Sequence, residues 1–309
     1  GDRYRNTFGA QRRGRYGRVV LTRTLTLEEP FDMLRTLRML EVGERVDDGS
    51  WWWATHTAGG IGTIRIDRTA TGVLATAWGE GGEALLERLP DLVGQRDVSV
   101  LTRVPDRSRA LLRQARGVRL GRSGDVHTAL VKAVLGQVVT TREASQNLRR
   151  ITRSLGDVAP GPRRMVTVPR PEVLSELTYS DLHQFGIERR RAAILIEISR
   201  RSNRMLEILP MEREDAYRRL VAVRGIGEWS AAGVMGTAWG DKDAVPVGDY
   251  HIPNDVAWVL AGRDRGTDDD MLELLEPFRP ERRRFIVALK LGNVHAPRYG
   301  PKSAVRRHL

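Results

Sequence analysis

The feature that most constrains the fold of this chain is a change of hydrophobic period near Asp125. Upstream, apolar and polar residues alternate, as they do over Arg18–Leu27, and this pattern predicts strands. Downstream, apolar residues recur every three or four positions, first at Val126, Leu130, Val134 and Val138. That spacing predicts helices. The sequence therefore predicts an α+β protein, with an N-terminal mixed α/β domain followed by a mainly α-helical region.

Three more strands are expected in the N-terminal domain, over Ser50–Thr57, Gly62–Arg68 and Gly72–Trp78. A helix is expected from Pro30 to near Gly43, and a second over Glu83–Leu89, stopped by Pro90. The first of these three strands contains three consecutive tryptophans. Because side chains alternate across a strand, Trp51 and Trp53 should share one face and Trp52 the other.

The length of 309 residues suggests about two domains, and basic segments flank them. We expect a basic tail without regular structure over 1–17, because arginines and glycines dominate it. The N-terminal domain should span 18–115. A helical core of two subdomains should span 116–295, including a helix–hairpin–helix over 212–239 and a loop over 240–250. A second basic tail covers 296–309.

The charge balance favours a polyanionic partner. The formal net charge is +12, and binding to phosphates releases their counterions. The chain has no cysteine, which excludes disulfides, thiol nucleophiles and cysteine-held metal clusters. No segment approaches the length of a membrane span, and the start of the chain lacks the apolar core of a signal peptide. We therefore expect a cytoplasmic, nucleoid-associated protein without membrane contact.

A glycine hairpin is the first motif that points to a ligand. Arg224, Gly225, Ile226 and Gly227 separate two predicted helices. Glycines let a phosphate approach the backbone, and the N–H groups that open the second helix can bind it. Such a turn on its own is equally an ordinary connector between helices.

The hairpin is followed at a fixed distance by one carboxylate. Asp249 stands twenty positions after Trp229, in the segment Pro246–Tyr250 ahead of another predicted helix. An isolated aspartate at this place is most often an N-cap, because its oxygen satisfies the first free N–H groups of the helix. The combination of a glycine hairpin, an aromatic residue and a Gly-Asp loop is a more specific signal than the hairpin or the aspartate alone.

This combination resembles the helix–hairpin–helix DNA glycosylases, and within them the 3-methyladenine DNA glycosylase II type. The resemblance covers roughly residues 18–295 and includes Ala133–Gln137, Phe185–Ile187 and Arg191-Ala192. It implies an N-terminal α/β domain and two helical domains with the active cleft between them. It also implies base excision repair of alkylated or otherwise damaged bases in double-stranded DNA, by a monomer.

The resemblance assigns the chemistry to two positions. Asp249 would be the catalytic residue, stabilising positive charge at the sugar C1′ and orienting water for attack. Bifunctional relatives carry a lysine where this chain has Trp229. Because no amine is available there, the resemblance implies a monofunctional enzyme without lyase activity.

The same resemblance places the base pocket at Trp229, Tyr250, Gly233 and Lys290. Aromatic faces at Trp229 and Tyr250 would attract a cationic alkylated base, although core packing is the alternative role for both. Gly233 and Lys290 stand where aromatics are usual. The glycine widens the pocket and the lysine would repel a cation, so the preferred base remains open.

DNA contacts are implied for the hairpin, Arg224 to Gly227, and for Gln137 and Val138. Val138 either fills the gap left by a flipped base or packs on the apolar face of its helix. The family hairpin often holds a monovalent cation, Na⁺ or K⁺, through backbone carbonyls, which match Val221, Val223 and Ile226. No other cofactor is implied.

Two other functions fit parts of the sequence. A non-catalytic binder of distorted or damaged DNA would also need the hairpin and the charge. A transcription factor is less favoured, because Trp229–Trp239 has few side chains that read bases. The basic run Arg189–Arg191 either contacts phosphate or is a solvated helix face.

Overall fold

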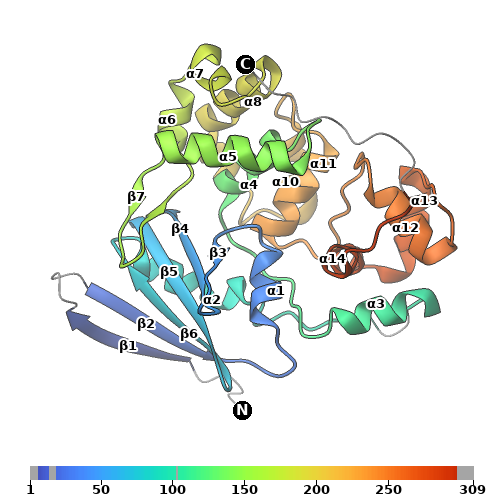
Figure 1. Ribbon diagram of the computed structural model, residues 1–309, viewed down its shortest axis with the longest axis horizontal. Helices are drawn as coiled ribbons and strands as arrows, with labels where there is room; N and C mark the ends of the chain where they lie inside the picture. The colour runs from blue at the N-terminus through green and yellow to red at the C-terminus, as the bar shows by residue number, and fades with distance from the viewer. Residues whose placement is uncertain (1–5, 14–18, 102–103, 298–309) are drawn as a thin grey trace.

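The computed structural model describes residues 6–13, 19–101 and 104–297. Six strands form an antiparallel sheet in the order β1-β2-β6-β5-β4-β3. Their bounds are β1 Asn6–Arg13, β2 Val19–Thr26, β3 Glu44–Arg45, β4 Trp51–Thr57, β5 Gly60–Thr69 and β6 Gly72–Trp78. Two helices belong to this sheet domain, α1 Met33–Arg38 and α2 Gly82–Leu92. Figure 1 shows the sheet in blue, apart from the green and orange helices.

The tryptophan pattern is confirmed in β4. Trp51 and Trp53 lie in the core between the sheet and its helices. Trp52 lies on the other face and stacks on Trp78, with ring centroids 5.3 Å apart. Pro90 is a correction, because α2 continues past it to Leu92. A proline removes one helical hydrogen bond and crowds the preceding turn, but burial of Leu89 and Leu92 holds the last turn in place.

The N-terminal segment also differs from expectation. Residues 6–13 are not a structureless tail, since β1 pairs antiparallel with β2, with Asn6 opposite Leu25 and Arg13 opposite Val19. Backbone pairing explains this, because an edge strand offers unpaired N–H and C=O groups to any extended segment. Residues 1–5, 14–17 and 298–309 of the two expected tails lie outside the described residues.

The helical region forms two groups. The first contains α4 Val126–Leu135, α5 Thr141–Leu155, α6 Pro171–Ser175, α7 Tyr179–His183, α8 Arg189–Arg200, α9 Ser202–Leu206, α10 Arg213–Val221 and α11 Glu228–Val234, which continues as a π-helical turn, Met235–Trp239. A short hairpin of β7 Val158–Ala159 and β8 Met165–Val166 extends from it. The second contains α12 Ile252–Ala261, α13 Asp268–Leu275 and α14 Arg282–Gly292.

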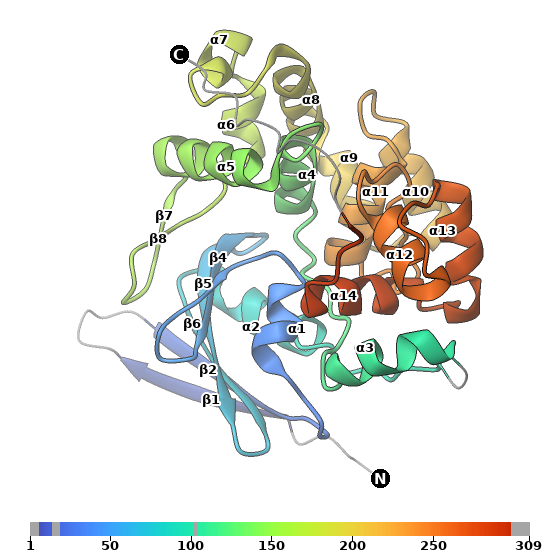
Figure 2. The same cartoon turned by 45° about the vertical axis from the view of Figure 1, so that its right-hand side comes forward.

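The helix α3, Arg109–Gln114, lies just before residue 115, inside the predicted N-terminal domain. Its Leu111 is buried with Phe278 and Phe285 in the core of the second helical group. The segment before 115 therefore packs with the C-terminal helices, because the apolar face of α3 meets α14. In Figures 1 and 2, α14 lies between α3 and α11, with α1 beside it.

Candidate active site

The glycine hairpin joins α10 to α11 as predicted. The turn is closed by the Ile226 N–H, which donates to the Val223 carbonyl at 2.9 Å. Gly225 has a φ of +96°, and a Cβ there would lie 2.5 Å from the side chain of Ile194. Glycine is therefore required at Gly225 by backbone shape and close packing. At Gly227 a Cβ would meet nothing within 4 Å, so the start of α11 is open to a ligand.

Asp249 is held by three N–H donors. Its Oδ1 accepts from the backbone of His251 at 2.8 Å and of Ile252 at 2.9 Å, at the start of α12. Its Oδ2 accepts from Nε1 of Trp229 at 2.9 Å. Asp249 is thus both a helix cap and a partner of the hairpin tryptophan. Charge-assisted hydrogen bonds of this kind fix the direction of a carboxylate.

Trp229 lies between the aspartate and the end of α4. Its ring edge is 3.2 Å from the position that a Cβ on Gly136 would take, so a side chain there would push the indole by a few tenths of an ångström. The ring is half-buried, and its N–H points at Asp249. The tertiary fold therefore brings together two residues twenty positions apart that the sequence singled out.

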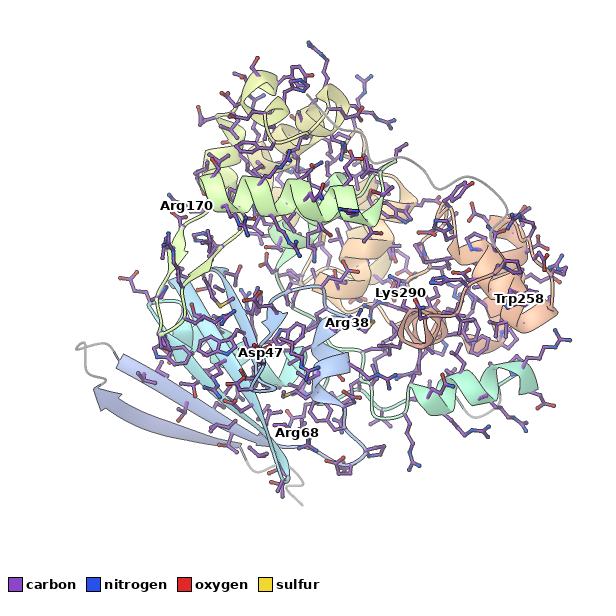
Figure 3. The ribbon with its side chains drawn as sticks, viewed as in Figure 1. Arg38, Asp47, Arg68, Arg170, Trp258 and Lys290 are labelled. Carbon is purple, nitrogen blue, oxygen red and sulfur yellow. The ribbon has the colours of Figure 1, made fainter. Side chains whose placement is uncertain are left out.

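The remaining pocket residues are more open. The side chain of Tyr250 is 84% exposed and contacts the ring of His251 edge-on, which excludes a core role. Gly233 is exposed, and a Cβ there would meet nothing within 4 Å. Lys290 is exposed on α14, as Figure 3 shows. No contact of Lys290 with Asp249 or Trp229 is present in the described residues.

Val138 does not continue the apolar face of α4, because that helix ends at Leu135. The residue is 88% exposed and has a φ of +55°. A β-branched residue in this region is strained, and such strain is concentrated at functional sites. Packing is therefore excluded as the role of Val138.

The loop that carries Val138 is anchored at both ends. Gln137 donates through Nε2 to the Gly225 carbonyl at 2.9 Å and to Oγ of Ser230 at 3.0 Å, which ties the loop to the hairpin. Arg191 donates to the Leu135 carbonyl at 3.0 Å and to Oε1 of Glu143 at 3.3 Å. The loop is thereby fixed between the ends of α4 and α5.

Arg191 corrects the interpretation of the basic run. The Arg191 and Glu143 side chains are 3% and 7% exposed, so this arginine faces the protein interior. Arg189 lies over the ring of Tyr179, at 4.6 Å from its centroid. Thr140 caps α5, since its side chain accepts from the Glu143 N–H, and the Glu143 carboxylate pairs with Arg191. No sequence signal points to this pair, because the two residues are far apart in the chain.

A metal centre built from side chains is absent among the described residues, where no group of three or more His, Asp or Glu side chains converges. No helix in the described ranges is long and apolar enough to cross a membrane. The predicted carbonyl ligands Val221, Val223 and Ile226 all lie at the hairpin, where the Val223 carbonyl already closes the turn.

The chain is similar to known DNA glycosylases in sequence and in fold. The chain is 26% identical to YfjP of Bacillus subtilis over 175 residues, 55% of this chain and 60% of that protein. It is 28% identical to DNA-3-methyladenine glycosylase 2 of Escherichia coli over 141 residues, 44% of this chain and 49% of that one. The solved 3-methyladenine DNA glycosylase of Archaeoglobus fulgidus superposes with a TM-score of 0.75 at 20% identity, covering 86% and 97% of the two chains.

The chain is similar in sequence to DNA-3-methyladenine glycosylases and shares its fold with a solved enzyme of that type, as helix–hairpin–helix DNA glycosylases do. Its curated homologues are of the 3-methyladenine glycosylase type. No protein-family model matches the chain. It spans between 49% and 60% of the length of the curated relatives described above. The sheet domain followed by helices is also the fold of the Archaeoglobus fulgidus enzyme, which confirms the α+β fold predicted from the sequence.

Proposed function

We propose that this glycosylase homologue is a monofunctional DNA glycosylase that removes damaged bases in base excision repair. The observation that carries the proposal is the hydrogen bond between Trp229 and Asp249, 2.9 Å long, beside an open hairpin. It couples a fixed carboxylate to the element expected to bind the DNA backbone. The likeness to glycosylases that act on 3-methyladenine supports damaged bases as substrates.

The proposed reaction is hydrolysis of the N-glycosidic bond. A nucleotide flipped out of the duplex places its C1′ near Asp249. As the bond from C1′ to the base nitrogen breaks, its electron pair leaves with the base and positive charge develops on the sugar. The carboxylate stabilises that charge, and a water oxygen bonds to C1′. The water loses one proton to Asp249, which passes it to solvent. An uncharged base departs as an anion and takes one proton from solvent, whereas a cationic base departs neutral.

Trp229 determines the fate of the DNA strand after the base has left. An indole has no amine to attack C1′, so no Schiff base forms and the DNA backbone stays intact. The product is an abasic site. The same side chain donates its only N–H to Asp249, which fixes the direction of the carboxylate.

DNA binding involves the surrounding elements. Gly227 and Arg224 on the hairpin lie exposed where a phosphate would meet the start of α11. Val138, exposed on its anchored loop, would occupy the space left by the flipped base. The carbonyls of Val221, Val223 and Ile226 would hold a monovalent cation that brings the hairpin closer to a phosphate.

The test is a base-release assay on duplex DNA treated with a methylating agent. Free methylated purines should appear, detected by chromatography, and strands should break only after hot alkali. Strand breaks without alkali would contradict the monofunctional assignment. Tight binding without any released base would instead favour a non-catalytic binder of damaged DNA.

A further inference from the structure

Three consecutive arginines open α14, and the middle one differs from its neighbours. Arg282 forms two hydrogen bonds with the carboxylate of Asp243, at 2.9 and 2.7 Å. Arg284 binds Asp97 at 2.8 Å and Glu281 at 2.7 Å. Arg283 is 8% exposed but forms no ion pair with any described carboxylate. Its guanidinium has one acceptor there, the Met39 carbonyl, at 3.3 Å.

An unpaired buried guanidinium is costly, so its retention needs an explanation. Burial lowers the pKa of Arg283, and the field of nearby carboxylates opposes this only partly. Each of those carboxylates is committed to another cation, Glu41 to Lys132, Asp241 to Arg213, and Asp97 to Lys242 and Arg284. None of these carboxylates forms an ion pair with Arg283 among the described residues, so its other N–H groups have no protein acceptor there.

Arg283 lies at one end of a strip of the hairpin helix. Trp229, Gly233 and Gly236 follow each other at intervals of four and three residues, the spacing of one helix face. A Cβ on Gly236 would lie 2.5 Å from Nε of Arg283, so the guanidinium packs directly on that glycine. At 1.5 Å per residue, about 10 Å of helix separates Trp229 from Gly236.

Between Trp229 and Gly236 this face of the helix carries no side chain. Gly233 presents no side chain, and a Cβ there would meet nothing within 4 Å. Gly233 therefore places no side chain between Trp229 and Gly236 on this face of the helix. Lys290 lies on the same face of α14 as Arg283, two turns further on, because seven residues separate them. Both side chains bring positive charge to α14, which lies beside α1 (Figures 1 and 2).

We propose that the pocket selects an uncharged damaged base with an acceptor oxygen, which Arg283 binds, over a cationic N-alkylated base. This inference rests on the proposed glycosylase function and assigns its substrate class. A carbonyl oxygen of the base accepts from the guanidinium, which supplies the partner that Arg283 lacks. A cationic base placed at the same point meets a like charge in a site of low dielectric.

The same contact assists bond cleavage. An uncharged base leaves with the electron pair of the glycosidic bond, so negative charge develops on its ring and carbonyl oxygen before a proton arrives. A guanidinium at that oxygen stabilises the charge. A cationic base leaves neutral and gains nothing from Arg283. The residue should therefore discriminate between the two classes in the rate of release.

The experiment compares two purines in the same duplex sequence under single-turnover conditions. Hypoxanthine is uncharged and has a carbonyl at C6, whereas 3-methyladenine is cationic and has an amino group there. The full chain should release hypoxanthine faster. Arg283→Met should lower hypoxanthine release about tenfold or more, the usual effect of losing a charged hydrogen bond, and leave 3-methyladenine release unchanged or faster.

Two further variants complete the test. Arg109→Met removes an exposed arginine of α3 and should change neither rate. Gly233→Tyr fills open space without meeting described atoms, so it should fold and slow release of both bases. Equal effects of Arg283→Met on both bases, or none, would overturn the inference while leaving the glycosylase function intact. Failure of the full chain to release either base would overturn both.

Discussion

Two loops face the expected DNA side, and they are built in opposite ways. The loop with Asp249 presents a polar group whose oxygens are all directed by N–H donors, two of them from the next three residues. The loop with Val138 presents an apolar side chain on strained backbone, held by residues far along the chain. Hydrogen bonds to nearby residues are enough to position the Asp249 carboxylate, whereas the exposed Val138 side chain depends on contacts with residues distant in the sequence.

The largest expected effect on base release comes from removing the charge of Asp249. Asp249→Asn should lower base release by about a thousandfold, because loss of one preorganised electrostatic group costs 10²–10³ or more in rate. Binding to damaged duplex should persist. Single-turnover release and gel-shift binding measure the two. Asp47→Asn, at an exposed acid in the sheet domain labelled in Figure 3, is the control. Release at the normal rate by Asp249→Asn would show that another group is the catalyst.

The anchor of the second loop should have the largest effect on stability. Arg191→Met leaves Glu143 buried without its cation, which should cost about 3 kcal/mol in the free energy of unfolding. Urea denaturation measures it. Arg190→Met, on the same helix but exposed, should change stability by less than about 0.5 kcal/mol. Adding Glu143→Leu should recover much of the loss, and a failure to do so would mean that the pair is not the anchor.

A smaller effect on base release is expected from the hydrogen bond that joins the Asp249 loop to Trp229 of the hairpin. Trp229→Phe keeps an aromatic ring but removes the N–H that binds Asp249, so base release should fall about tenfold. Trp239→Phe is a matched control, because that indole donates to the Ile208 carbonyl instead. Equal rates for both variants would mean that the Trp229 hydrogen bond does not position the carboxylate.

The smallest change in stability should come from relaxing the second loop. Val138→Gly removes left-handed strain but adds chain entropy to the unfolded state, so the net shift should stay below about 1 kcal/mol. Activity should fall on duplex DNA and hold on single strands, where no gap needs filling. Val98→Gly, also exposed on a loop, should leave the ratio of the two activities unchanged.

The contrast between the loops also explains how far the sequence could predict the structure. The sheet, the helices, the hairpin and Asp249 can be predicted from local patterns, because period, glycine turns and caps act over a few residues. The Arg191–Glu143 pair, the strain at Val138 and the unpaired state of Arg283 depend on contacts between distant segments. β1 was also missed, because its stability comes from pairing with β2 rather than from its own composition.

That first strand bears on how the protein can be shortened. Deletion of residues 1–13 would seem harmless, because the segment is basic and rich in glycine. The deletion would nevertheless remove β1, the strand that pairs with the outer edge of β2, Val19–Thr26. The backbone N–H and C=O groups of β2 that lose their partners could then pair with the same edge of a second copy of the chain. Shortened versions are therefore expected to self-associate, and tags at this end are better added ahead of residue 6 than substituted for the strand.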